Sequence, residues 1–147
     1  MRSKKFSDER GQASVEMLFF VLILALLFFG AVELGRGVLL KHALDVGTEK
    51  AARVLSINPT DYGTAEAVIC MEVDANLLGG GYGSQVMIRL YDAGTLTTIS
   101  SPDLAAAPFG YRFLVGAELP WQAFVPFMSL GGRTLTAAHQ GIVERFP

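Results

Sequence analysis

The sequence is poor in the residues that build catalytic and metal centres. Among 147 residues it holds one cysteine, Cys70, and two histidines, His42 and His139. A single cysteine excludes an internal disulfide. The histidines are far apart in the sequence, and no cysteine cluster accompanies them that could complete a zinc site. Because the carboxylates also follow no catalytic motif, we expect no enzyme activity, no metal site and no cofactor.

Charge is scarce as well. Charged residues make up 18% of the chain and the formal net charge is −2. Residues 1–11 carry four basic and two acidic side chains, so the remainder of the chain is net acidic. An acidic chain offers no basic surface for phosphates, and we therefore expect no nucleic-acid partner.

A long hydrophobic run lies near the N-terminus instead. Every residue from 17 to 32 is apolar or glycine, and extension back to Ala13 gives about twenty residues, enough to span ~30 Å of hydrocarbon. Within this span Glu16 is the one charged residue, and a carboxylate there is costly and a functional candidate. The basic segment before the span predicts a cytoplasmic N-terminus, a single pass through the inner (cytoplasmic) membrane and a head outside it.

The junction between the charged segment and the span carries a processing signal. A secretory signal would place its apolar region before the cleavage site, whereas here Gly11 precedes the apolar run. Glycine followed at the fifth position by glutamate, Glu16, resembles the processing site of type IV prepilins. The resemblance implies a prepilin peptidase as partner and a cut between Gly11 and Gln12. A signal anchor that is never cleaved is the alternative.

Glu16 has a second implied role, in subunit assembly. Residues four apart share a helical face, so Glu16 would lie one turn from the free amine of Gln12. An unpaired charge in an apolar environment is expensive, and pairing recovers much of the loss. In pilins this glutamate is thought to neutralise the amine of a neighbouring subunit. The simpler alternative is that Glu16 reaches the lipid headgroups.

The helix is predicted to continue beyond the membrane to residue 56, because the residue before Pro59 is driven out of helical geometry. Apolar residues at intervals of three and four predict a buried face, and charged residues at intervals of four predict a solvated face. The apolar face comprises Leu40, Leu44, Gly47, Ala51 and Val54, and the charged face comprises Lys41, Asp45, Glu49 and Arg53.

The sequence therefore predicts an α+β protein of three parts: a leader (1–11), a transmembrane and amphipathic helix (12–56) and a small antiparallel head (57–147). A second helix is expected over 64–78, with a strand through 67–69 as the competing interpretation, followed by a glycine-rich linker over 79–83. Alternation of apolar and polar residues and β-favouring composition indicate strands over 85–91, 95–100, 111–119 and 133–146. Residues 101–108 and 120–130 are expected to be loops.

The second of these loops is rich in aromatic residues. Trp121, Phe124 and Phe127 lie within seven residues, with Met128 beside them. If they were exposed, such a patch would be a candidate interface, because aromatic side chains dominate interface energetics. The alternative is that they fold back over the sheet, where each buried side chain contributes roughly 1.5–3 kcal/mol.

Four blocks together resemble one family. They are GQASVE (11–16), ELGR (33–36), EKAARVLS (49–56) and GGRTLTAAHQGIVE (131–144). The chain resembles a TadE-like minor pilin of the tight-adherence (Flp) system. The resemblance implies a structural subunit that assembles or caps a type IV pilus and supports surface adhesion. It also implies pilin subunits, the tight-adherence assembly platform and the lipid bilayer as partners, and a final location on the cell-surface pilus.

Two features argue against the major subunit, and two other functions stay open. Major Flp pilins usually carry tyrosine after the glutamate and lack a head of this size, whereas this chain carries Met17 and a large head. A type II secretion pseudopilin would show the same processing site and helix. An uncleaved, signal-anchored periplasmic protein could instead bind an assembly partner or ligand through its head.

Overall fold

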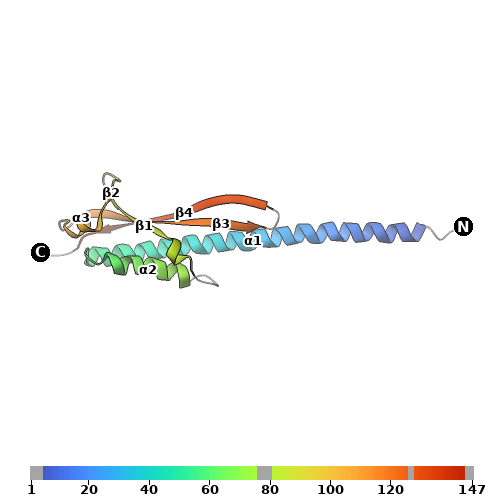
Figure 1. Cartoon of the computed structure of the whole chain (residues 1–147), viewed down its shortest axis with the longest axis horizontal. Coiled ribbons are helices and arrows are strands. Elements are labelled where there is room, and N and C mark those ends of the chain that lie inside the picture. Colours follow the sequence, from blue (N-terminus) through green and yellow to red (C-terminus); the bar gives the residue numbers. More distant parts are fainter. Residues whose placement is uncertain (1–4, 76–80, 126–127, 145–147) are drawn as a thin grey trace.

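A helix of 53 residues dominates the architecture. The computed structural model describes residues 5–75, 81–125 and 128–144, with side chains over 12–75, 81–122 and 132–144. The first half of the long helix, α1 (Lys5–Ile57), projects from a head formed by all the other elements (Figure 1). These are α2 (Tyr62–Ala75), the 3-10 turn η1 (Gly83–Gln85), β1 (Met87–Asp92), β2 (Thr98–Ile99), α3 (Ser101–Ala105), β3 (Arg112–Val125) and β4 (Met128–Ile142). The predicted α+β class is confirmed.

The second half of α1 forms the centre of the head. It lies between α2 on one side and the strands β3 and β4 on the other (Figure 1). The predicted apolar face is confirmed, since four of its five residues are buried and Val54 is half-buried. Because α1 is covered from two sides, further residues that the single-face prediction left out are also in the core, namely Ala43, Ala52 and Leu55.

The helix α2 confirms the predicted second helix, and the competing strand interpretation is wrong. α1 ends at Ile57, just before Asn58 and Pro59 as expected. α2 then runs back along α1 and buries Ala65, Ile69 and Val73 at intervals of four. The two helices come very close at Gly47, where an added Cβ would lie 3.1 Å from the Cα of Ile69.

The sheet has four antiparallel strands in the order β2-β1-β3-β4. All four predicted strands are present, although the second is only two residues long. β1 pairs with β3 from Met87 opposite Glu118 to Asp92 opposite Phe113. The buried residues of β3, Phe113, Val115, Ala117 and Leu119, alternate along the strand. Such alternation is expected of a sheet with one face turned to the core.

The loop predicted over residues 101–108 is wrong in its first part, because α3 occupies Ser101–Ala105. The Ser100 side chain accepts a hydrogen bond from the backbone N–H of Asp103, and the Asp103 carboxylate accepts one from the backbone N–H of Ser100. This reciprocal capping, with Pro102 in the first turn, satisfies the free N–H groups of a helix start. Leu104 of α3 is fully buried in the core.

The loop predicted over residues 120–130 is also wrong. β3 continues to Val125, and β4 begins at Met128 opposite it. Pro120 pairs in register with Thr134 and is tolerated because it lies beyond Glu118, the last residue of β3 that pairs with β1. We call the part of this hairpin that extends beyond β1, residues 120–125 and 128–134, the hairpin arm.

Candidate functional site

At the N-terminal end of α1, two predicted site residues lie one turn apart. The Gln12 side-chain amide donates a hydrogen bond of 3.3 Å to the Glu16 carboxylate, and both residues are exposed. Helical geometry extends from Lys5 through Gly11, so the backbone at the expected cut is helical. The geometry therefore puts Glu16 within one turn of position 12. Cleavage between Gly11 and Gln12, and the assembly role of Glu16, stay predictions.

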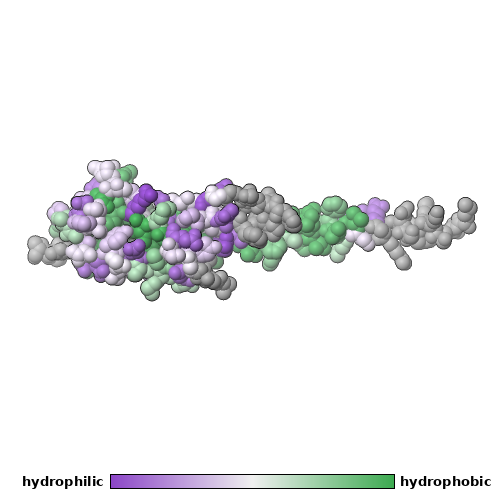
Figure 2. Space-filling view, viewed as in Figure 1, coloured by the Kyte–Doolittle hydropathy of each residue, from purple (hydrophilic) through white to green (hydrophobic). Residues whose placement is uncertain are grey.

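The segment that follows is long and apolar enough to cross a membrane. The helix from Gln12 to Ile57 contains an 18-residue window of mean hydropathy 2.7, and no residue of that window is buried inside the protein. Figure 2 shows a hydrophobic surface on this part of α1, in contrast to the mixed surface of the head. An exposed apolar helix of this kind fits a single-pass membrane protein.

Just beyond the apolar segment of α1, Arg36 is the centre of a network of one ion pair and two hydrogen bonds. The guanidinium group forms an ion pair of 2.9 Å with Glu33, one turn earlier in α1. It also donates to the hydroxyl of Tyr82 (3.1 Å) and to the backbone carbonyl of Gln122 in β3 (2.9 Å). Arg36 therefore connects α1 to two segments that are distant in the sequence. We call these four residues the neck.

Trp121 lies next to the neck. A Cβ added to Gly37 would lie 3.1 Å from the Trp121 ring, so the absence of a side chain at position 37 lets the indole approach α1. Trp121 is half-buried and packs against the core. Its indole N–H has no hydrogen-bond acceptor among the described residues. Of its two predicted companions, the backbone of Phe124 pairs with Ser129, and Phe127 lies outside the described residues.

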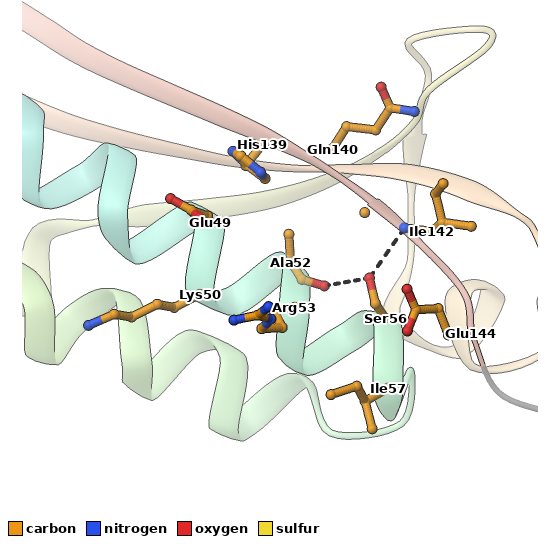
Figure 3. A pocket seen from close by; sticks show the side chains of 11 residues that line it. Glu49, Lys50, Ala52, Arg53, Ser56, Ile57, His139, Gln140, Ile142 and Glu144 are labelled. Atoms are coloured by element: carbon orange, nitrogen blue, oxygen red, sulfur yellow. Dashed lines mark hydrogen bonds between the residues drawn. The ribbon is translucent and has the colours of Figure 1, made fainter.

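A polar groove of about 440 Å³ lies at the opposite end of the head, between α1 and the outer edge of β4 (Figure 3). Ser56 closes one end, since its hydroxyl accepts a hydrogen bond from the backbone N–H of Ile142 and its carbonyl accepts one from Glu144. Polar and charged side chains from α1, β4 and the residues after β4 line the groove, including Glu49, Arg53, His139 and Glu144. Glu49 and Arg53 belong to the charged face predicted for α1, and they are exposed as expected.

A further hydrogen-bonded pair fixes the turn between β1 and β2. The Tyr111 hydroxyl donates a 2.6 Å hydrogen bond to the Asp92 carboxylate, which also accepts bonds from Gly94 and Thr95. These bonds, the one from Tyr111 above all, lower the pKa of Asp92 to about 2. The same bond raises the pKa of Tyr111 to about 12. Because these interactions close a local turn, we assign them to stability.

The two histidines lie on different elements. His139 belongs to β4 and lines the polar groove, whereas His42 is exposed on α1. Within the described ranges no group of three or more histidine, cysteine, aspartate or glutamate residues is arranged to hold a metal ion.

The comparisons with known proteins bear on the helical half of the molecule. Residues 11–53 match the family model described as TadE-like protein. The matched residues all lie in α1. The resemblance predicted from the sequence is thereby confirmed, and it indicates a component of the Tad pilus system with a membrane-spanning helix. No curated protein and no solved structure matches the chain.

The sequence does not predict the neck as a site. The motif ELGR at 33–36 is one of the blocks that resemble TadE-like proteins, but it does not identify the partners of Arg36. Tyr82 lies within the glycine-rich segment, and Gln122 lies in the segment predicted to be a loop. The acceptor on Gln122 is a backbone carbonyl. A backbone carbonyl carries no sequence signal, so only the fold identifies it.

Proposed function

We propose that this chain is a minor pilin of the tight-adherence (Flp) system, cut by a prepilin peptidase between Gly11 and Gln12. The observation that carries the proposal is the coincidence of the TadE-like match over 11–53 with an apolar segment of α1 that follows that cut and is not buried inside the protein. In this proposal the N-terminus is cytoplasmic, the head lies outside the inner membrane, and the mature subunit enters or caps a pilus that supports surface adhesion.

Glu16 is the assembly residue in this proposal. The Gln12–Glu16 contact supports it, because it shows that the carboxylate of residue 16 reaches position 12 on one helical face. In a filament the carboxylate would pair with the amine of a neighbouring subunit in an apolar environment. Removal of one partner from a buried ion pair costs about 3–5 kcal/mol, because the other charge is left uncompensated.

The test of processing is the N-terminus of the protein in the membrane fraction, read by mass spectrometry. We expect Gln12 in a strain that has the prepilin peptidase and Met1 in a strain that lacks it. Gly11→Leu should block the cut because a bulky side chain hinders entry of the backbone into the peptidase. Gly35→Leu is the matched control on the same helix, where an added Cβ meets nothing within 4 Å. Met1 in both strains would favour the uncleaved anchor.

The test of assembly is the amount of the subunit in sheared filaments. Glu16→Ala should leave cleavage intact and reduce incorporation by well over tenfold, in line with the cost of an unpaired buried charge. Glu49→Ala removes an exposed carboxylate from the same helix and should leave incorporation unchanged. Normal incorporation of Glu16→Ala would contradict the assembly role.

A further inference from the structure

The sequence at the end of the hairpin arm is almost wholly apolar. Between Gln122 and Gly131 the only polar residue is Ser129. The described backbone of this segment is extended on both strands, with Phe124 opposite Ser129 and Val125 opposite Met128. An apolar hairpin end of this kind needs an apolar environment, because contiguous apolar surface is rarely left in water.

Two fixed points define the direction of the hairpin arm. At the far end of the head, Ser56 of α1 binds the backbone of Ile142 and Glu144. At the near end, Arg36 of α1 binds the backbone of Gln122. β3 therefore runs antiparallel to α1, and the hairpin arm points along α1 toward its apolar first half, as Figure 1 shows.

The depth of the hairpin arm can be estimated from these contacts. Trp121 lies level with Gly37, which is about 7.5 Å beyond Val32, the last residue of the apolar span, at 1.5 Å per residue. Val125 is a further ~13 Å along β3, at 3.3 Å per residue. The end of the hairpin arm therefore lies about 6 Å on the membrane side of Val32, level with Phe28.

The exposure of α1 agrees with this estimate. Leu26, Gly30 and Glu33 follow one another at intervals of four and three, and Gly37 continues the same face. All four residues are half-buried, whereas Leu27 beside them is exposed. This face of α1 is thus less exposed than its neighbour as far down as Leu26, inside the candidate membrane span.

The residues just above this level are of the kinds found at membrane surfaces. Trp121 and Tyr82 both lie beside Arg36, whose guanidinium carbon is 5.9 Å from the centre of the Tyr82 ring. Arg133, opposite Trp121 on β4, is exposed. Tryptophan and tyrosine concentrate at the headgroup level of a bilayer, where an apolar ring with a polar tip is stabilised.

We propose that the end of the hairpin arm inserts into the outer leaflet of the bilayer beside α1, as a second and interfacial membrane anchor. The inference rests on the proposed placement of α1 in the membrane. The ligand is a lipid surface, with acyl chains around the strand ends and headgroups around Trp121 and Tyr82. Two anchors would fix the rotation and height of the head above the membrane, which one helix alone leaves free.

Hydrogen bonding limits how deep the hairpin arm can go. A two-stranded hairpin leaves the outer edges of both strands unpaired, and unpaired backbone groups are excluded from the hydrocarbon centre. A depth of about 6 Å keeps these edges near the interface, where interfacial apolar segments commonly lie 5–10 Å into the headgroup and acyl boundary.

The single tryptophan of the chain makes a direct test possible. The full chain is reconstituted into phosphatidylcholine vesicles whose acyl chains carry bromine, which quenches nearby tryptophan, either close to the carbonyl or at mid-chain. Tryptophan is moved within a Trp121→Phe background to Val125, to Phe28 at the same depth on α1, or to Phe109 at the far end of the head. We expect Val125→Trp to lose as much fluorescence as Phe28→Trp, and Phe109→Trp to lose none.

The controls separate this inference from the proposed function. Quenching of Phe28→Trp without quenching of Val125→Trp would overturn the hairpin insertion and leave the membrane helix intact. Absence of quenching in both would overturn both. The wild-type protein gives an independent measurement that needs no substitution, since Trp121 should be quenched by bromine near the carbonyl and spared by bromine at mid-chain. Insensitivity of wild-type Trp121 to both positions would also overturn the insertion.

Discussion

The two halves of α1 differ in composition and in what surrounds them, since residues 17–32 carry no charge and the second half carries charged residues from Arg36 to Arg53. In the first half, most leucine and phenylalanine side chains are exposed, as Leu24 is by 55%. In the second half, Leu40, Leu44 and Leu55 are fully buried, and charged residues occupy the remaining face. A helix that is apolar on every side over residues 17–32 therefore fits a lipid environment, whereas a helix with a charged face and an apolar face fits packing against protein.

The glycines of α1 show the same difference. An added Cβ at Gly30 or Gly35 would meet nothing within 4 Å, whereas at Gly37 and Gly47 it would lie 3.1 Å from Trp121 and Ile69 respectively. The glycines of the second pair are therefore required by contacts inside this chain. For the first pair, no contact among the described residues explains the choice of glycine.

The largest expected effect on the free energy of unfolding is seen when a leucine in each half of α1 is replaced by alanine. Leu44→Ala should lower the free energy of unfolding of the head by about 2–5 kcal/mol, because it leaves a cavity between α1, α2 and the sheet. Leu24→Ala should change it by less than about 0.5 kcal/mol, because Leu24 has no packing partner in the head. Urea unfolding of the full chain in detergent micelles measures both. Equal effects would contradict the distinction between the halves.

A smaller effect is expected from adding one methyl group at the helix contact. Gly47→Ala should destabilise the head by about 1–3 kcal/mol, since the new Cβ meets the backbone of Ile69, which cannot move aside as a side chain could. Gly35→Ala should stabilise α1 by up to ~1 kcal/mol through helix propensity alone. Thermal unfolding by circular dichroism compares the two. A neutral Gly47→Ala would show that α1 and α2 can separate without cost.

The neck should contribute less than the core. Arg36→Gln removes the bonds to Tyr82 and to the Gln122 carbonyl and should cost about 1–2 kcal/mol, with faster amide hydrogen exchange confined to the hairpin arm and η1. The control is Lys41→Gln, which breaks an exposed ion pair with Asp45 and should cost less than about 0.5 kcal/mol. Exchange that rises uniformly over the head would contradict a local role for Arg36.

The smallest effect is a pH dependence confined to the head. Because the pKa of Asp92 is lowered to about 2 in the folded protein, its bond to Tyr111 stabilises the fold above the unfolded pKa near 4 and is lost as the pH falls from ~4 to ~2. The raised pKa of Tyr111, about 12, adds stability below pH ~10 that is lost as the pH rises to ~12.

Tyr111→Phe removes this bond and isolates its contribution. The difference in unfolding free energy between wild type and variant should be constant from about pH 5 to pH 9 and should narrow at both extremes. The measurement is urea unfolding at a series of pH values. A difference independent of pH down to pH 2 would contradict the assignment.

Local patterns identified most of the helical half and part of the sheet. The end of α1 before Pro59, the buried face around Leu44 and the contact between positions 12 and 16 all follow from helical spacing along one continuous segment. The short helix α3 has a local signal as well, in the Ser100–Asp103 capping pair, but five residues are too few for periodicity to detect.

The hairpin arm shows why the remainder could not be predicted. Pro120 and the aromatic residues after it favoured a loop, because proline removes a backbone donor. β3 continues through Pro120 because β1 pairs with β3 only as far as Glu118, so the missing N–H of Pro120 breaks no bond to β1, and because β4 pairs with β3 on its other side. These pairings join residues more than ten positions apart in the sequence. The partners of Arg36 are equally distant in the sequence.

The sequence by itself therefore determined an apolar helix with one carboxylate at its start, its continuation into an amphipathic half and its likeness to TadE-like proteins. These properties depend on neighbours within one or two helical turns. Only the tertiary structure decided that α1 is enclosed from two sides, that Arg36 joins α1 to Tyr82 and Gln122, and that the hairpin arm points along α1 toward its apolar first half. The reason is physical: strand pairing and helix packing join residues far apart in the chain, and register and distance along α1 emerge only when the chain is folded.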